Sequence, residues 1–395
     1  MKPEETPVRQ WLLVGALALA PAVSNGFARF AYGLILPAMR DDLGWNYTQA
    51  GWINTANALG YLIGALVGLT LIARLGSRVL FAAGMALTAV ALLFSGFTEN
   101  FWFLTLWRVL AGVGGAPAFI AGGAMVSAVF RGQPVRSAAA IALYFGGGGI
   151  GMFLSGSTLP FVLQGNPAAW PEVWIGMGLV SLVTLIPTAW VVRSVAPGTR
   201  GSAAPKPGRL PWPAMSLELI AYFLFAVGYI VYLTFIVAWM REEQASVGLV
   251  AAMWSLIGIM VMASPLLWRG VLARHSGGVP MALACTATGV ATLLPLVVPG
   301  AIGVLASAFV FGGSFFMGPG SVTAFGRNNL PEAQWGASIA LFTTIFAVGQ
   351  LIGPVAAGYI ADASSDLTLG LIAAGATLLL AGLLAAFQKP LAAGD

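Results

Sequence analysis

Residues 24–45 read SNGFARFAYGLILPAMRDDLGW and lie at the end of the first long apolar segment of the chain. This stretch carries Asn25, Arg29 and Tyr32 among apolar residues, and the charged triplet RDD follows them at 40–42. A charged side chain inside an apolar helix is costly and marks a functional position by default. Arg29 is therefore the first candidate for a functional residue, and the question is what its guanidinium faces.

The composition places the chain in a membrane. Hydrophobic residues make up 59% of the 395 residues and charged residues only 8%, whereas soluble domains carry about 25% charged residues. A surface this poor in charge must be solvated largely by lipid. A net charge of +5 would favour nucleic acid as a partner of a soluble protein. In a membrane protein, basic residues gather in cytoplasmic loops instead, so we expect no nucleic-acid partner.

Twelve apolar segments are long enough to cross a membrane, since a spanning helix needs about 20 apolar residues. They cover residues 11–38, 47–72, 79–97, 101–130, 137–163, 171–192, 214–239, 246–268, 279–298, 300–325, 334–361 and 367–387. Many contain glycine or proline, which membrane helices tolerate because small residues allow close packing and neighbours re-satisfy the backbone. The sequence therefore predicts an all-α membrane protein.

The distribution of Lys and Arg predicts the orientation of these helices. With both termini in the cytoplasm, the outer loops hold two basic residues, Arg40 and Arg241. The inner loops and tails then hold fourteen: Lys2, Arg9, Arg74, Arg78, Arg131, Arg136, Arg193, Arg200, Lys206, Arg209, Arg269, Arg274, Arg327 and Lys389. Because cytoplasmic loops of membrane proteins carry such an excess, both termini are predicted to be cytoplasmic.

The two halves of the chain repeat one another around a polar linker. Residues 193–213, RSVAPGTRGSAAPKPGRLPWP, separate two sets of six predicted helices. AMRDD at 38–42 is echoed by WMREE at 239–243. The sequence therefore predicts two pseudo-symmetric six-helix bundles, over residues 1–192 and 214–395, joined by a cytoplasmic linker.

The sequence lacks the motifs of enzymes and cofactor sites. It has no HExxH, GxSxG or Walker lysine pattern and no Cys/His cluster. The single cysteine, Cys285, stands in an apolar run and is expected to pack rather than react. We therefore expect no enzyme activity, no cofactor and no metal site.

Two motifs resemble those of the major facilitator superfamily, and the resemblance covers essentially the whole chain. GLTLIARLGSR at 68–78 is similar to the loop motif after the second helix, with Ala73 where aspartate is usual. RVLAGVG at 108–114 matches the RxxxGxG pattern of the fourth helix. The opening stretch, followed by AGWINTANALGYLIGAL, resembles the YbfB/YjiJ-like branch of the superfamily.

The resemblance implies a fold and a mechanism, but no particular substrate. Two six-helix bundles would rock about a central site lined by the first, fourth, seventh and tenth helices. Arg74 and Arg78 of the loop motif would take part in gating. Gly112, in the fourth-helix motif with Arg108, would take part in coupling.

Arg29 and Arg108 are predicted to form a cationic spot within the membrane. Counted from the outer ends of their helices, both lie roughly 10–14 Å deep at 1.5 Å per residue. No Asp or Glu lies at that depth in the sequence. The planar guanidinium suits a carboxylate, sulfonate or phosphate, so we expect an anion site. The alternative is that both arginines lock helices together through backbone or interfacial contacts.

Other polar and aromatic side chains occur at helical spacing near these depths. The further candidates for substrate binding are Asn25, Tyr32, Asn54, Asn57, Tyr229, Tyr232, Ser314 and Gln350. Hydrogen bonds between helices and aromatic packing are the alternative roles for these residues.

Acidic residues are candidates for coupling and gating. Glu218 lies near the cytoplasmic start of the seventh helix and is the one acid placed to carry a proton. The alternative is that Glu218 lies at the membrane interface and faces water or Arg209. Asp41 and Asp42 lie at the outer end of the first helix and are expected to cap helix ends, as part of an outer gate.

These features predict a secondary transporter in the cytoplasmic membrane of a bacterium. We expect a monomer in contact with lipid that moves a small organic anion, such as a carboxylate, by alternating access, with proton symport as the candidate coupling. Two alternatives stay open. One is a multidrug-type exporter of neutral or cationic lipophilic compounds, and the other is a membrane receptor or scaffold that transports nothing.

Overall fold

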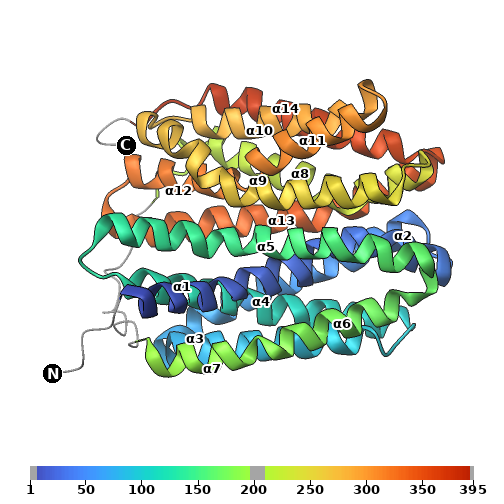
Figure 1. Cartoon of the computed structure of the whole chain (residues 1–395). Helices are drawn as coiled ribbons and strands as arrows, with labels where there is room; N and C mark the ends of the chain where they lie inside the picture. The colour runs from blue at the N-terminus through green and yellow to red at the C-terminus, as the bar shows by residue number, and fades with distance from the viewer. Residues whose placement is uncertain (1–6, 196–209, 392–395) are drawn as a thin grey trace. The chain divides into compact units, whose positions relative to one another are not determined.

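The computed structural model describes residues 7–195 and 210–391, and these two ranges contain helices and no strands (Figure 1). The helices are α1 Pro7–Pro21, η1 Ala22–Phe30, α2 Tyr32–Leu43, α3 Tyr47–Ser95, α4 Phe101–Val129, α5 Pro134–Gly165, η2 Pro167–Ala169, α6 Trp170–Val183, α7 Leu185–Ser194, α8 Ser216–Glu242, α9 Val247–Arg274, α10 Val279–Val297, α11 Gly300–Ser314, α12 Met317–Asn329, α13 Glu332–Ser364 and α14 Leu367–Ala386. Residues 196–209 of the predicted linker lie outside the described residues.

Joined across their kinks, the described helices form twelve segments long and apolar enough to cross a membrane. This confirms the twelve predicted spans. The second and third spans run into each other as α3, and the bend between them is at Gly76, with φ 79° and ψ 160°. Only glycine adopts such a conformation readily, so this glycine of the loop motif ends one span and starts the next.

The first span is not a regular α-helix. Its middle part, η1, is a π-helix, in which the Ala31 N–H donates to the Gly26 carbonyl five residues earlier at 2.9 Å. Every residue of η1 is buried, including Asn25 and Arg29. π-helices are rare in proteins and often occur at functional sites.

The chain divides into two compact units. Unit 1 comprises Met1–Ala38 and Ala56–Ser202, and unit 2 comprises Met39–Thr55 and Ala203–Asp395. The predicted division into bundles over 1–192 and 214–395 stays a prediction. The structure adds that Met39–Thr55, the tip between the first two spans, clusters with the C-terminal helices.

Unit 1 is held together by close helix contacts at glycine. The first span packs against α5 and α4. A Cβ added to Gly26 would lie 2.5 Å from the Gly151 Cα, and one added to Gly147 would meet the Ala18 carbonyl. Small residues therefore bring the backbones of α5 and the first span into direct contact, as in other membrane helix pairs.

Unit 2 is built around α8. This helix packs on α13 and α14, α10 packs on α11 and α14, and α9 packs on α11. The spans Pro7–Leu43 and Ser216–Glu242, which stand first in each set of six, bury equal shares (78%) of their most apolar windows. Both spans are therefore covered by protein over most of this window. Polar side chains on them need hydrogen-bond partners from protein, water or ligand.

Candidate functional site

Arg108 of α4 is enclosed in unit 1. Its side chain is 1% exposed and lies over the rings of Trp174 (4.8 Å) and Tyr32 (5.6 Å). Nη2 donates to the Ala28 carbonyl of η1, while Nε and Nη1 have no hydrogen-bond partner among the described residues. Aromatic faces stabilise the cation, but two of its donor nitrogens are left for a partner that the described chain does not supply.

Arg29 lies on η1 in the same unit and is 5% exposed. Its guanidinium carbon lies 5.1 Å from the ring centre of Tyr61 and 6.0 Å from that of Phe30. Asn25, on the same π-helix, is also 5% exposed. The positive charges of Arg29 and Arg108 repel each other across this part of unit 1, and no carboxylate of the described residues lies within ion-pair distance of Arg108.

The two asparagines of α3 have different partners. Asn57 Nδ2 donates to the Arg108 backbone carbonyl at 3.1 Å, not to its guanidinium. Gly112 lies one turn further along α4, where an added Cβ would meet the Asn57 carbonyl oxygen and lie 2.5 Å from the Tyr61 nitrogen. Asn54 Nδ2 donates to Thr234 Oγ1 at 2.5 Å within unit 2. The amide groups of Asn54 and Asn57 thus bond to neighbouring helices in this structure.

In unit 2 the predicted polar residues are hydrogen-bonded to one another or to neighbouring helices. Gln350 Nε2 donates to the Tyr229 hydroxyl, joining α13 to α8. The Tyr232 hydroxyl is 2.7 Å from Ser307 Oγ, and Ser314 Oγ is 3.0 Å from Thr288 Oγ1. Tyr229 and Gln350 are thus brought together, whereas Tyr232 and Ser314 have separate partners.

Sequence reasoning missed a set of stacked rings in unit 2, which we call the aromatic column. Its members come from α8, α13 and the α11 to α12 region: Tyr222, Phe225, Tyr229, Tyr232, Phe311, Phe315 and Phe346. The i, i+3, i+7 spacing on α8 is visible in the sequence. The partners on other helices are not, so the spacing alone indicated only packing.

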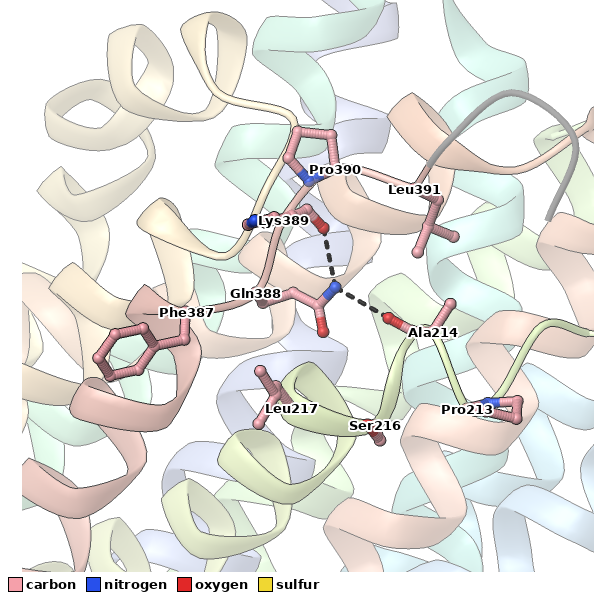
Figure 2. Close-up of a pocket in the computed structure, with 9 residues that line it drawn as sticks. All are labelled: Pro213, Ala214, Ser216, Leu217, Phe387, Gln388, Lys389, Pro390 and Leu391. Carbon is pink, nitrogen blue, oxygen red and sulfur yellow. Dashed lines mark hydrogen bonds between the residues drawn. The ribbon is translucent and has the colours of Figure 1, made fainter.

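Glu218 lies at the start of α8, in unit 2. It is 1% exposed, its backbone N–H donates to Gln388 Oε1 at 3.2 Å, and its Oε2 has no hydrogen-bond partner among the described residues. Figure 2 shows Gln388 Nε2 donating to the carbonyls of Ala214 (3.0 Å) and Lys389 (2.8 Å), beside a cavity of about 380 Å³. Glu218 is therefore a buried acid rather than one that faces water.

The tip between the first two spans is tied to unit 2 by charged groups. Arg40 pairs with Asp41 at 2.9 Å and approaches Glu242 at 3.8 Å, while the Tyr47 hydroxyl donates to Glu242. Asp42 is exposed beside this network.

A second contact, which the sequence did not indicate, completes this attachment. Asp362 of α13 accepts from the backbone N–H groups of Tyr47 and Thr48, both at 2.8 Å, and from Thr48 Oγ1 at 2.6 Å. It thereby caps the N-terminus of α3.

The two arginines of the loop motif differ in their surroundings. Arg78 donates through Nε (2.8 Å) and Nη2 to the carbonyl of Val195 at the end of α7. Arg74 is exposed. The structure therefore places Arg78 in a tie between two helix ends of unit 1, while a gating role for either residue stays a prediction.

Twelve apolar spans with close glycine contacts and two buried guanidinium groups are the features of a polytopic membrane protein, and they are typical of a transporter. The family model described as "Uncharacterised MFS-type transporter YbfB" matches residues 21–386. The chain belongs to this family of the major facilitator superfamily, which confirms the resemblance in the sequence.

Three relatives are named as transporters. The 3-(3-hydroxy-phenyl)propionate transporter of Escherichia coli is 29% identical over 96% of this chain and 94% of its own length. Monocarboxylate transporter 11 of Homo sapiens is 24% identical over 93% of this chain and 80% of its own. The uncharacterized MFS-type transporter YceJ of Bacillus subtilis is 26% identical over 61% of this chain, and the match spans 62% of its own length.

Two solved structures share the fold. A bacterial homolog of the human lysosomal transporter Spinster, in an inward-facing and unoccupied conformation, aligns with a TM-score of 0.69 at 17% identity over 97% of both chains. A variant of the nucleoside transporter NupG aligns with a TM-score of 0.74 at 13% identity over 96% of this chain and all of the other. At these identities the likeness concerns the fold alone.

Proposed function

We propose that this transporter moves a small organic anion, such as a carboxylate, across the cytoplasmic membrane of a bacterium by alternating access. In this proposal the protein works as a monomer with both termini in the cytoplasm. Arg29 contacts the anion and Arg108 supplies a second positive charge. Asn25 and Tyr32 belong to the same part of unit 1, and Tyr229 and Gln350 are the candidates in unit 2.

The observation that carries the proposal is the state of Arg108. Two of its nitrogens are buried without a hydrogen-bond partner among the described residues. A buried unsatisfied donor costs about 1–3 kcal/mol, and more when it is charged. An anion near this guanidinium would lower that cost and offset the repulsion between Arg108 and Arg29. A cationic substrate would increase both.

Two relatives support an anionic substrate. The names of the Escherichia coli and human relatives specify a propionate derivative and a monocarboxylate, respectively. Both substrates are carboxylates, which arginine binds through two parallel hydrogen bonds. This chain shares less than 30% identity with either protein. We therefore extend to it only the carboxylate group of these substrates, and not the rest of their structures.

Proton coupling is the second part of the proposal, and it depends on Glu218. The side chain is buried with one carboxylate oxygen unpartnered among the described residues, and a carboxyl group in such surroundings can gain and lose a proton during a transport cycle. Glu218 lies on α8 beside Gln388, so a change in its protonation would act on the start of that helix.

Ligand-induced thermal stabilisation of the purified protein tests the anion. A ligand at 100 times its Kd adds about 2.7 kcal/mol to stability, so carboxylates, sulfonates, phosphates and lipophilic cations can be ranked directly. We expect carboxylates to stabilise the wild type and not Arg29→Gln. Arg136→Gln is the matched control, because Arg136 is exposed and bonds Gln133 at 2.9 Å. Stabilisation by cations alone would overturn the proposal.

A further inference from the structure

We infer that protons reach Glu218 from the cavity at the start of α8, and that the Gln388 side chain opens and closes this path. The inference rests on the proposed role of Glu218 in proton coupling. It goes beyond that role because it names the route of the proton and the residue that controls it. Every group involved belongs to unit 2.

Glu218 is enclosed although it stands in the first turn of α8. Its side chain is 1% exposed, and its Oε2 has no hydrogen-bond partner among the described residues. The titratable group on which its charge acts from a neighbouring helix is the thiol of Cys285 on α10, which is also buried. A buried carboxyl can exchange a proton only when water or another proton donor reaches it, so Glu218 needs a path that opens.

The cavity shown in Figure 2 extends to the residues next to Glu218. Ser216 and Leu217, which directly precede Glu218, line it, whereas Glu218 itself does not. Lys389 and Pro390 also line it and are exposed, so the cavity lies at the surface of unit 2. Its volume of about 380 Å³ far exceeds the roughly 10–15 Å³ that a cavity needs to hold one water molecule. Water can therefore come close to Glu218 from this side.

Gln388 lines the cavity and also bonds the backbone of Glu218. Its Oε1 accepts from the Glu218 N–H at 3.2 Å, and its Nε2 donates to the carbonyls of Ala214 at 3.0 Å and Lys389 at 2.8 Å (Figure 2). Although Gln388 follows the last helix, it is only 7% exposed. When these three bonds break, water in the cavity can replace them, so the side chain has a bonded closed position and a solvated open one.

The backbone of this segment is held independently of the Gln388 side chain. The Gly278 N–H, at the start of α10, donates to the Gln388 carbonyl at 2.9 Å. The Leu391 N–H donates to Asn329 Oδ1 at 2.8 Å. Neither bond uses the amide group of Gln388. The side chain can therefore change its rotamer while residues 387–391 stay in place.

Labelling of Glu218 with a water-soluble carbodiimide and glycinamide tests the inference in the full-length protein. These reagents convert a carboxyl that water reaches into an amide, which mass spectrometry of the peptides quantifies. We expect slow labelling of Glu218 in the wild type. Gln388→Ala removes the two hydrogen bonds to Glu218 and Ala214. Two such bonds correspond to about 5- to 150-fold more frequent opening, so labelling should be faster by the same factor.

Asn329→Ala is the matched control. The Asn329 amide also makes three hydrogen bonds, one with the Leu391 N–H and two with backbone carbonyls, and none with the start of α8. This variant should leave the labelling of Glu218 at the wild-type rate. Gln388→Met keeps the volume of the side chain but not its hydrogen bonds, so it replaces Gln388→Ala in the comparison if the alanine variant does not fold.

The outcomes separate this inference from the proposed role of Glu218. Unchanged labelling in the Gln388 variants, or an equal increase in Asn329→Ala, overturns the path through Gln388 and leaves the role of Glu218 intact. Uptake measured against pH tests that role: pH dependence that survives in Glu218→Gln overturns it, and the inference with it. Faster labelling in the Gln388 variants alone, with pH dependence lost in Glu218→Gln, supports both.

Discussion

Replacing Asp362 by alanine should release the start of α3 from unit 2. The Asp362 carboxylate accepts from two backbone N–H groups and one hydroxyl of Tyr47 and Thr48. It lies 315 residues from Tyr47 in the chain, so the contact joins the tip Met39–Thr55 to α13. Both flanks of this tip belong to unit 1. The contact with Asp362 therefore lies within unit 2, and the chain passes into unit 1 on either side of the tip.

The size of the effect follows from the cap. Removing a side chain that caps a helix N-terminus costs about 0.5–2 kcal/mol, and hydrogen bonds to a charged acceptor lie at the upper end of the usual range. We expect Asp362→Ala to lose about 2 kcal/mol of capping free energy. This corresponds to about a 30-fold shift in the equilibrium between the attached and the released tip. Asp362→Asn should lose part of this stabilisation, because its one amide oxygen can replace only one carboxylate oxygen, while its NH2 group would face a backbone N–H of Tyr47 or Thr48.

Hydrogen exchange of the backbone amides measures this equilibrium directly. In Asp362→Ala the amides of Tyr47 and Thr48 should exchange about 30-fold faster than in the wild type if opening of the cap limits their exchange. Asp366→Ala is the control, since Asp366 caps its own helix by accepting from the Thr368 N–H at 2.8 Å. Unchanged protection of residues 47–48 in Asp362→Ala would refute the reasoning, and so would an equal effect in Asp366→Ala.

Three further variants test other parts of the molecule. Gly112→Ala places a methyl group against backbone atoms of Asn57 and Tyr61. It should lower the free energy of unfolding by about 1–3 kcal/mol, measured by thermal unfolding. The control Gly123→Ala should lower it much less, because the nearest neighbour of its new methyl group is a Tyr144 ring atom at 3.7 Å. Glu218→Gln should remove the pH dependence of uptake. The control Glu172→Gln should keep it, because Glu172 is exposed. If uptake by Glu218→Gln still depends on pH, Glu218 is not the proton carrier. Arg108→Lys keeps the charge but loses the planar fork and both aromatic stacks, so it should weaken carboxylate binding; equal binding would show that Arg108 only links helices.

The spans could be predicted from sequence because they depend on a local property. Twenty apolar residues suffice to cross a membrane whatever lies next to them, and the twelve predicted segments correspond to those of the structure. The π-helix could not be predicted in this way. Its irregular hydrogen bonding accompanies the close approach of Gly26 to Gly151 on α5, and nothing in residues 22–30 alone reveals that contact.

The candidate site was predictable only in part, for a similar reason. Arg29 and Arg108 stand out because charge is rare in a membrane span, and the structure buries both in unit 1. Hydrogen-bond partners depend on tertiary packing. Asn57 therefore bonds a backbone carbonyl of α4, which is the hydrogen bond between helices that the sequence left open as the alternative to substrate binding. Asp362 was missed because its partners are backbone groups far away in the chain, which leave no pattern in its own neighbourhood.

The π-helix in the first span has a consequence for how this transporter could change during evolution. A helix with one surplus residue holds the segments before and after it out of phase with a regular α-helix. Deleting one residue within Ala22–Phe30 would let this stretch return to regular α-helical hydrogen bonding, while the segments on either side keep the faces that they now present. A single codon could thereby change which side chains from the middle of the first span lie beside Arg108, without altering a loop or any residue of unit 2.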